Sequence, residues 1–425
     1  MHTHAGRGAP RPPADREGAR VAPYEDIRVT GHLIDSQIVS RIMDDIVALD
    51  GEFETLTFQV GRTNEDPSVA VLRVKGRDAE HLAQVLDAIR EHGAVPLHDT
   101  DVELAPAPAD GVFPACFYST TNLVTHLRVG GEWLPVANPE MDCAVRVDPV
   151  AGTAETVALS EVRAGDLLVV GHGGVRVTPL ERPRDQQAFE FMASEVSSEK
   201  PKAQVVRMVA ALLRETRECG RAIIAVVGPA VVHTGAAGEL ARLVRAGYVS
   251  VLFGGNAVAV HDIESALYGT SLGVRLDEGV PVPGGHEHHL RAINTVRAAG
   301  GIAAAVEQGV LTEGLMHTLV TTGTPFVLAG SIRDDGPLPD VITDALEAQR
   351  AMRGWCRDAG ACLMLSTMLH SIATGNMLPA ATTTVCVDIN PAVVTKLADR
   401  GSFQTIGVVT DVGLFLQMLA DELEC

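Results

Sequence analysis

The chain of 425 residues lacks several features that define whole classes of protein. No stretch approaches the roughly 18 consecutive apolar residues that a membrane-spanning helix needs. Its seven cysteines are odd in number and form no Cys-x-x-Cys pair. This pattern favours reduced thiols over a disulfide framework or a cysteine-type zinc site. We therefore expect a cytoplasmic protein that does not bind membranes.

Basic residues are too few for a surface that binds nucleic acid. Lys and Arg total 34, against 54 Asp and Glu, which gives a formal net charge of −20 at pH 7. Contacts to phosphates need clustered Lys and Arg, so neither nucleic acid nor an anionic membrane is expected as a partner. The hydrophobic fraction of 46% is that of a folded globular protein. At roughly 100–200 residues per domain, the length predicts two to three domains.

The first half of the chain predicts a tail and two small units. Residues 1–24 are polar, rich in Pro and Gly, and without the apolar core of a secretory signal, which indicates a disordered tail. Residues 25–106 carry patterns for a strand, a helix, two strands, a helix and a strand, the order of a ferredoxin-like α+β domain. Residues 107–185 hold short extended runs broken by turn residues, which predicts a small β-rich domain.

Residues 186–425 predict an α/β domain with a parallel sheet. Short apolar runs, such as those at 221–228 and 362–366, alternate with helical patterns. Strands that are apolar throughout are typical of a parallel sheet with helices on both faces. The predicted fold class is therefore α/β, with the parallel-sheet domain preceded by the ferredoxin-like domain and the β-rich domain.

Small and polar residues gather where five of the predicted strands end. Ligands of open α/β sheets bind beyond the carboxyl ends of the strands. After one strand, Gly254 and Gly255 remove side-chain bulk, and Asn256 and Ala257 begin a helix whose amides can bind phosphate. Asp388 ends another strand, where an acidic residue can accept hydrogen bonds from the ribose hydroxyls of a dinucleotide. The alternative is that such residues only cap helices, and no Gly-x-Gly-x-x-Gly fingerprint is present.

Long strings in the sequence are specific to one family. They are FYSTTN (117–122), EMD (140–142), FEFM (189–192), GPAVVHTG (228–235), GGNAVAVHDIE (254–264), GTSLG (269–273), GGHEHHLRAIN (284–294), AGSIRDDGPLPDV (329–341), TMLHSIATGNMLP (367–379) and VCVDINPAVVTKL (385–397). Over about residues 25–425 the chain resembles the NAD-dependent ornithine cyclodeaminases of archaea and the C-terminal half of the cyanobacterial arginine dihydrolase/ornithine cyclodeaminase. The N-terminal region of that family is shared with plant lysine-ketoglutarate reductase/saccharopine dehydrogenase.

The resemblance implies a modified Rossmann-like domain at 186–425 that holds NAD without the glycine fingerprint. The NAD contacts that it implies fall on the predicted strand ends, at Asn256, Ala257, Asp335, Thr367, Met368, Leu369, His370, Asp388, Asp411 and Val412. It also implies conversion of L-ornithine to L-proline and ammonia. Hydride leaves Cα for NAD+ and returns to the cyclic imine, so NAD is used catalytically. We further expect a homo-oligomer.

The resemblance leaves the acid–base residues open. The reaction needs a group that accepts and returns protons near the substrate amines, and a cation for the substrate carboxylate. The predicted acid–base candidates are His261, Asp262, Glu264 and Asp334. The predicted substrate contacts are Asn122, Arg297 and Arg333. The alternative for each charged candidate is a helix cap or a structural ion pair.

A histidine cluster near residue 287 has the side chains of a metal site. His286, His288 and His289 lie beside Glu287, but a further ligand at suitable spacing is not evident, so we predict no metal site.

The alternative functions are a related NAD-dependent dehydrogenase or lyase acting on another diamino acid, and a non-catalytic regulator that binds NAD or an amino acid. The small N-terminal α+β domain motivates the regulator. Net accumulation of NADH would favour a dehydrogenase.

Overall fold

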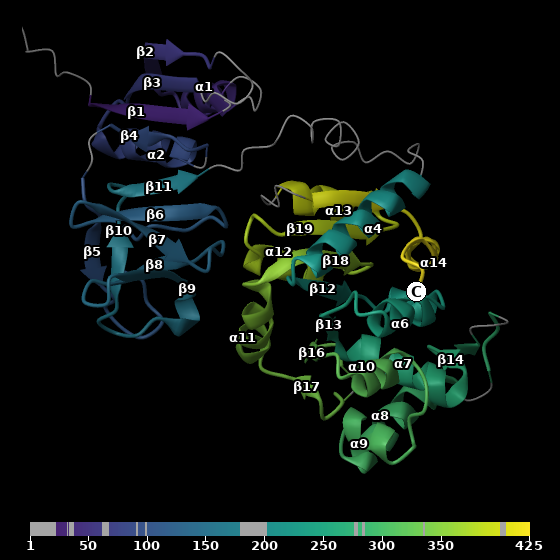
Figure 1. Cartoon of the computed structure of the whole chain (residues 1–425). Coiled ribbons are helices and arrows are strands. Elements are labelled where there is room, and N and C mark those ends of the chain that lie inside the picture. The colour runs from purple at the N-terminus through teal and green to yellow at the C-terminus, as the bar shows by residue number, and fades with distance from the viewer. Residues whose placement is uncertain are drawn as a thin grey trace, which may run out of the picture.

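The structure is a computed structural model, and it describes residues 23–31, 33, 38–61, 68–90, 92–97, 100–178, 202–275, 279–282, 285–334, 336–399 and 405–425. Residues 1–22 of the predicted tail and the candidate Asp335 lie outside the described residues. Within those described, no helix is both long and apolar enough to span a membrane. Figure 1 shows three units that follow one another along the chain, with the parallel-sheet unit beside the β-rich unit.

The first unit is a four-stranded antiparallel sheet with two helices. Its elements are β1 (Tyr24–Gly31), α1 (Ile38–Ala48), β2 (Glu52–Gln59), β3 (Ser68–Lys75), α2 (Ala79–Arg90) and β4 (Val95–Pro96). The strand order is β2-β3-β1-β4, and each neighbouring pair is antiparallel. Alternate residues of β3 are buried against the helices, as a sheet with one covered face requires. This order confirms the predicted ferredoxin-like topology.

The second unit is a seven-stranded, mostly antiparallel sheet. It comprises β5 (Glu103–Pro106), β6 (Val124–Val129), β7 (Glu132–Ala137), β8 (Ala144–Asp148), β9 (Thr153–Val157), the short helix η1 (Leu159–Glu161), β10 (Leu167–Val170) and β11 (Val175–Thr178). The strand order is β11-β6-β7-β9-β8-β10-β5. Strand β5 pairs with β10, although the predicted boundary after residue 106 leaves it with the first unit. We therefore propose that the boundary lies before Glu103.

The third unit is the parallel-sheet domain. Its elements are α4 (Lys202–Glu218), β12 (Ala222–Val227), α5 (Ala230–His233), α6 (Ala237–Arg245), β13 (Val251–Gly255), α7 (Asn256–Tyr268), β14 (Thr270–Ser271), β15 (Val274–Arg275), η2 (Gly285–Glu287), α8 (His288–Ala299), α9 (Ile302–Glu307), α10 (Leu315–Thr322), β16 (Phe326–Ala329), β17 (Val341–Ile342), α11 (Ala345–Cys356), β18 (Ala359–Leu365), α12 (Met368–Met377), β19 (Thr383–Asp388), α13 (Pro391–Asp399), β20 (Thr405–Val409) and α14 (Val412–Glu422). The strand order is β17-β16-β13-β12-β18-β19-β20, and every neighbouring pair is parallel.

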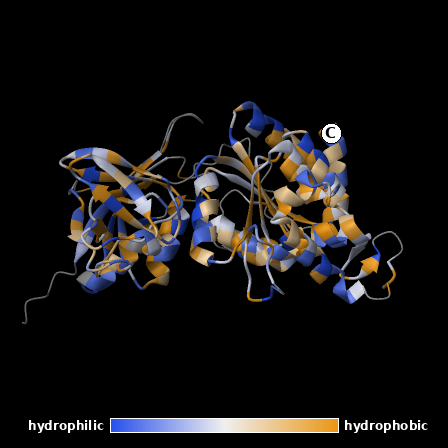
Figure 2. Ribbon diagram, turned by 90° about the horizontal axis from the view of Figure 1, so that it is seen from below, coloured by the Kyte–Doolittle hydropathy of each residue, from blue (hydrophilic) through white to orange (hydrophobic). Residues whose placement is uncertain are grey.

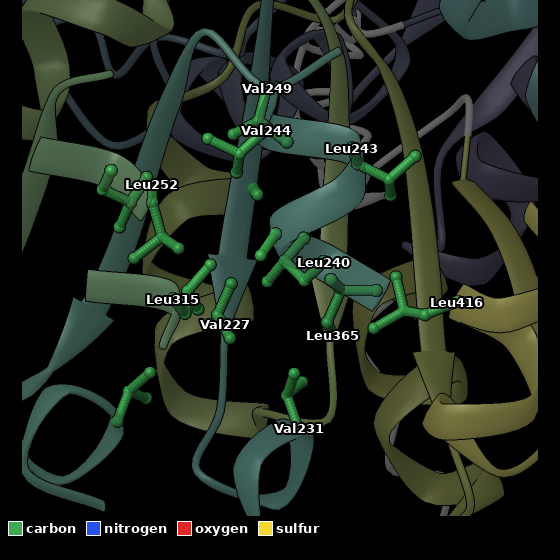
Figure 3. Packing of buried hydrophobic residues seen from close by; sticks show 14 of the residues in the cluster. Val227, Val231, Leu240, Leu243, Val244, Val249, Leu252, Leu315, Leu365 and Leu416 are labelled. Carbon is green, nitrogen blue, oxygen red and sulfur yellow. The ribbon is translucent and has the colours of Figure 1, made fainter. Parts of the chain in front are cut away.

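Apolar strand residues build a separate core on each face of this sheet. Along β12, Ile223, Ala225 and Val227 join the core that α4, α6, α7 and α14 cover, whereas Ile224 and Val226 join the core under α11, α12 and α13. Figure 3 shows Val227 of the first core among side chains from the neighbouring strands and helices. The apolar strands lie between helices in Figure 2. This arrangement confirms the prediction of a parallel sheet covered on both faces.

Candidate active site

The order of the strands reverses between β12 and β18. From β12 the chain continues to β13, β16 and β17 on one side of the sheet, and then to β18, β19 and β20 on the other. Ligands of open α/β sheets bind in the crevice at such a reversal. The candidate site is therefore the carboxyl edge of the sheet around β12 and β18.

The two backbones that border this crevice are in close contact. A Cβ atom on Gly228, which follows β12, would lie 2.0 Å from the carbonyl oxygen of Ser366. Ser366 follows β18 and has a φ of 51°, a left-handed conformation that few residues other than glycine adopt. Strained residues of this kind gather at functional turns. Neither residue could be predicted from the sequence, because a contact between two strand ends leaves no local pattern.

Helices α7 and α12, like the four-residue helix α5, begin at this edge without a side-chain cap. The N-caps of α7 and α12 are Gly255 and Thr367, and neither makes a capping hydrogen bond. Their first amides are therefore suited to bind an anion such as a pyrophosphate. In contrast, Asp344 caps α11, and Asp411 caps α14 by accepting a hydrogen bond from the amide of Leu414 at 2.9 Å. The difference favours α7 and α12 as the phosphate-binding helices.

The predicted NAD contacts that the structure describes lie along the same edge. They are Asn256 and Ala257 at the start of α7, Thr367 to His370 at the start of α12, Asp388 at the end of β19, and Asp411 and Val412 at the start of α14. Leu369 is 76% exposed, as a residue on an open binding surface would be. The side chain of His370 reaches towards β13, since its Nε2 lies 3.7 Å from where a Cβ atom of Gly255 would be. Burial lowers the pKa of His370, which keeps its imidazole neutral.

Asp388 and Asn256 differ in how much of the side chain is left for a ligand. Oδ1 of Asp388 accepts a hydrogen bond from the amide of Asn390 at 2.8 Å, and its Oδ2 has no hydrogen bond within the described chain. Asn256 is buried, and its Oδ1 accepts a hydrogen bond from the amide of Leu338 at 3.0 Å. Asp388 therefore keeps one carboxylate oxygen for a ligand, whereas Asn256 keeps only its amide nitrogen.

A buried polar network centred on Glu264 lies beyond β13. The side chain of Glu264 is 0% exposed and accepts four hydrogen bonds. The donors are Nδ1 of His261 at 3.0 Å, Oγ1 of Thr270 at 3.0 Å, and the amides of Leu272 at 3.2 Å and Gly273 at 2.9 Å. Burial alone would raise the pKa of Glu264, but the hydrogen bonds from His261, Gly273 and Thr270 bring that pKa below its usual value. Glu264 is thus a buried, charged carboxylate that orients His261.

Two more histidines belong to this network. His233, the last residue of α5, packs its ring against His261 with 4.8 Å between the centroids, and its Nδ1 lies 2.7 Å from Oγ of Ser271. His288 places Nδ1 2.8 Å from Oγ1 of Thr270. The roles of His233 and Ser271 could not be predicted from the sequence, because nothing local shows that α5 meets the hairpin of β14 and β15.

The other two acid–base candidates are engaged with backbone amides. Asp262 is 2% exposed, and its carboxylate accepts hydrogen bonds from the amides of Leu315 at 2.9 Å and Met316 at 2.7 Å, at the start of α10. Burial raises the pKa of Asp262 to about 6. Asp334 accepts a hydrogen bond from the amide of Ser331 at 2.8 Å in an exposed turn. Both carboxylates thus have a structural use, and neither belongs to the network around Glu264.

A small hollow lies beside Asp262. Its volume is about 160 Å³, and its polar lining includes Ser265 and Glu313. Asp262 lies about 100° around α7 from His261, because successive helical residues are 100° apart, and neither His261 nor Glu264 lines the hollow. The hollow is therefore separate from the network of histidines.

The three predicted substrate contacts lie on different elements. Arg297 on α8 donates a hydrogen bond to the carbonyl of Pro337, and Arg333 lies in the exposed turn after β16, so both border the same loop. Asn122 is buried between the second and third units, where its Nδ2 donates to the carbonyl of Leu378 at 3.4 Å. The structure therefore associates Arg297 with Arg333 through that loop and places Asn122 elsewhere.

A largely buried ion pair between Arg353 and Glu140 joins the second unit to the third. The single N–H at Nε of Arg353 on α11 is shared between the two carboxylate oxygens of Glu140, at 2.7 and 2.9 Å. The amide of Met141 donates to the carbonyl of Asn376 at the end of α12. The same helix whose first turn holds predicted NAD contacts is therefore tied at its other end to the β-rich unit.

No arrangement of three or more metal-binding side chains occurs among the described residues. His288 is engaged with Thr270 and stacks on Tyr268, while His286 lies 3.8 Å from Glu287. The histidine cluster of the sequence is therefore divided between the buried network and the surface.

Comparison with known proteins covers nearly the whole chain. Residues 24–123 match the LOR/SDH bifunctional enzyme conserved region, residues 124–206 match the first C-terminal region of ArgZ-like arginine dihydrolases, and residues 207–419 match the C-terminal Rossmann fold of the same proteins. The chain is 54% identical over 401 residues to a protein named ornithine cyclodeaminase from Methanopyrus kandleri, covering 94% of this chain and 97% of that protein.

Two solved structures are also similar. A conserved LOR/SDH protein from Methanococcus maripaludis has 52% sequence identity and a TM-score of 0.72, and the match covers 76% of this chain and 98% of that one. The ternary complex of AgrE with ornithine and NAD+ has 43% identity and a TM-score of 0.52, and the match covers 95% of this chain and 58% of that one. AgrE is named a bifunctional arginine dihydrolase/ornithine cyclodeaminase, from a species of Nostoc.

Proposed function

The chain belongs to the ornithine cyclodeaminase family, and on this premise we propose that it converts L-ornithine to L-proline and ammonia, with NAD used catalytically. The proposal rests on two features of the carboxyl edge: a helix start without a side-chain cap at the strand-order reversal, and a buried Glu264–His261 pair on the helix after β13. The first feature suits a dinucleotide, and the second suits proton transfer. The crystallisation of the related AgrE with ornithine and NAD+ supports the same pairing of ligands.

The residues at the edge of the sheet fit NAD chemically. Gly228 lets the end of β12 lie against Ser366. The first amides of α12 suit the pyrophosphate, and the second carboxylate oxygen of Asp388 suits the ribose hydroxyls. When bound, NAD+ supplies an acceptor for the hydride of Cα and returns that hydride later in the same cycle. The chain itself must supply orientation, exclusion of water and the proton transfers.

Proton transfer is assigned to His261, oriented by Glu264. Both amino groups of ornithine are protonated near neutral pH, and each must lose a proton before its nitrogen can react. Because Glu264 accepts the hydrogen bond of Nδ1, His261 is left with Nε2 to take and return such protons. Asp262 and Asp334 remain candidates of lower rank, since their carboxylates already accept backbone hydrogen bonds.

The substrate carboxylate is assigned to the loop after β16. Arg333 is exposed in that loop, and Arg297 is tied to the same loop at Pro337. A guanidinium group can bind a carboxylate through two parallel hydrogen bonds. Asn122, at the junction with the β-rich unit, is the proposed polar contact contributed from outside the parallel-sheet domain.

The reaction is tested with L-ornithine deuterated at Cα and an amount of NAD+ well below that of the substrate. We expect many equivalents of proline and ammonia per NAD, with most of the label retained in proline, because hydride leaves and returns within one cycle. Build-up of NADH in proportion to substrate consumed would instead indicate a dehydrogenase. Complete loss of the label to water would contradict the internal hydride transfer. L-lysine is the matched control substrate.

The compartment and the oligomeric state of the protein are also proposed. Its seven cysteines are free thiols, which supports a reducing, cytoplasmic compartment. A homo-oligomer is also proposed, and light scattering on the purified chain tests it directly. A molar mass near the 44.8 kDa of one chain would contradict that proposal.

A further inference from the structure

We propose that His233 is a second proton-transfer residue of the reaction proposed above, paired with His261 so that one imidazole accepts a proton while the other donates one. The inference rests on the proposed function. It is carried by two imidazole rings in contact at the carboxyl edge of neighbouring strands, one on the helix after β12 and one on the helix after β13.

Each ring is held at Nδ1 by a different partner. Nδ1 of His261 donates to the carboxylate of Glu264, and Nδ1 of His233 lies within hydrogen-bond distance of Oγ of Ser271. Neither Nε2 atom has a hydrogen-bond partner within the described chain. Neither of them belongs to the fully buried polar atoms that lack a partner, so a ligand can reach both. Two Nε2 atoms are therefore left for a bound substrate, on rings whose orientation is fixed by other contacts.

The surroundings of the two rings differ in charge. The carboxylate of Glu264 lies against His261 and can compensate a positive imidazolium there. Burial lowers the pKa of His233, the neighbouring His261 lowers it further, and only the more distant Glu264 opposes the shift. Helix α14, which also packs against α5, carries Asp411, but that carboxylate caps its own helix. The lowered pKa keeps His233 neutral and able to accept a proton, beside a histidine that is paired with a carboxylate.

The ring closure can be written with one role for each imidazole. Nε2 of neutral His233 takes a proton from the δ-ammonium, and the freed amine bonds to Cα of the protonated imine (C=NH2+), whose C=N π electrons move to the α-nitrogen and leave it as an NH2 group. Protonated His261 then gives a proton to the α-nitrogen, which leaves as ammonia with the electrons of its C–N bond. The ring nitrogen returns a proton to His261 as the cyclic iminium forms. Ammonia finally takes the proton held by His233, so both histidines end as they began.

The test compares His233→Ala with His317→Ala, since His317 lies on α10 outside the network. We expect His233→Ala to lower kcat about 10²–10⁴-fold, the usual range for loss of an acid–base group. KM for ornithine and the affinity for NAD+ should stay within about twofold of wild type. Added imidazole should restore part of the lost turnover in His233→Ala. His317→Ala should match wild type with or without imidazole.

A second variant, Ser271→Ala, keeps both imidazoles and releases only Nδ1 of His233. We expect kcat to fall by up to about tenfold, the scale of one hydrogen bond, with a displaced acidic limb of the pH–rate profile. A folded His233→Ala variant with wild-type kcat would overturn the inference alone. A loss of turnover without imidazole rescue, together with an unchanged Ser271→Ala profile, would assign His233 to packing and overturn it as well. Absence of proline formation by the wild-type protein would overturn the proposed function together with the inference.

Discussion

The two halves of the carboxyl edge of the parallel sheet differ in burial and in bonding. Beyond β12 and β13, charged and polar groups are buried and joined by hydrogen bonds, with Glu264 accepting four of them. Beyond β18 and β19, the side chains of Leu369 and Ile389 are exposed, and Asp388 keeps an oxygen without a partner in the described chain. The buried half, beyond β12 and β13, suits proton transfer because its side chains are held by hydrogen bonds. The open half, beyond β18 and β19, suits a cofactor that binds from solution.

The largest expected effect, on turnover, comes from a substitution in the buried half. Glu264→Gln keeps the size of the side chain but places an amide NH2 among four hydrogen-bond donors, so His261 loses its orienting carboxylate. We expect kcat to fall about 10²–10⁴-fold, with the NAD+ dissociation constant within about twofold of wild type. Steady-state kinetics and calorimetry measure the two quantities. Glu313→Gln, an exposed carboxylate beside the small hollow, is the matched control. Near wild-type turnover in Glu264→Gln would remove the network from the chemistry.

Asp262 is expected to give the next largest effect, on stability. Burial raises its pKa from the usual 3.8 to about 6, so the unfolded chain ionises first as the pH rises. Its contribution to the free energy of unfolding is therefore fully present below pH 4 and is lost as the pH rises through 6, by an amount on the order of 3 kcal/mol.

This contribution is measured against Asp262→Asn, which cannot ionise. Between pH 4 and pH 7, the free energy of unfolding of the wild type should fall relative to that of Asp262→Asn. Urea unfolding at several pH values provides the measurement, and Asp334→Asn in an exposed turn is the control. A difference between wild type and Asp262→Asn that does not change with pH would contradict the buried, raised carboxyl group.

In the open half, Asp388→Ala should weaken NAD+ binding by about 1.5–3 kcal/mol, the scale of a hydrogen bond to a charged group. The melting temperature without NAD+ should change little, because Asp388 supports only the turn at Asn390. Calorimetric titration measures the affinity, and Glu347→Ala, an exposed acidic residue on α11, is the control. Unchanged affinity in a folded Asp388→Ala variant would make this residue a turn former only.

The smallest expected effect in the open half comes from Asp411. Its Oδ1 is already used by the amide of Leu414, so Asp411→Ala should lower the free energy of unfolding by about 1 kcal/mol through the lost helix cap. NAD+ affinity should fall less than in Asp388→Ala. A larger loss of affinity in Asp411→Ala than in Asp388→Ala would reverse the relative importance of the two aspartates.

The parts of the fold that follow local patterns were predictable. The alternation along β3 and the continuous burial of β18 correspond to the two sequence patterns from which the antiparallel and parallel sheets were predicted. The strand-end positions of Asn256, Thr367 and Asp388 also followed, because each comes directly after a predicted apolar run. Such signals lie within a few neighbouring residues, which is why sequence alone conveys them.

The parts that depend on contacts between distant segments were not predictable. The close approach of Gly228 to Ser366 joins two strand ends, and the pairing of His233 with Ser271 joins a helix to a hairpin. From the sequence alone, Asp262 and Glu264 were equally good candidates for the acid–base residue. Only the fold separates them, because helical geometry turns Glu264 towards the histidines and Asp262 towards the start of α10.

The division of the edge into a chemical half and a cofactor half is tested most directly by the kcat of Asp388→Ala at saturating NAD+. If Asp388 serves only to bind the cofactor, the lost affinity is overcome by concentration, and kcat should return to within about twofold of wild type. A kcat that stays tenfold or more below wild type at saturation would place Asp388 in the chemistry and contradict the division.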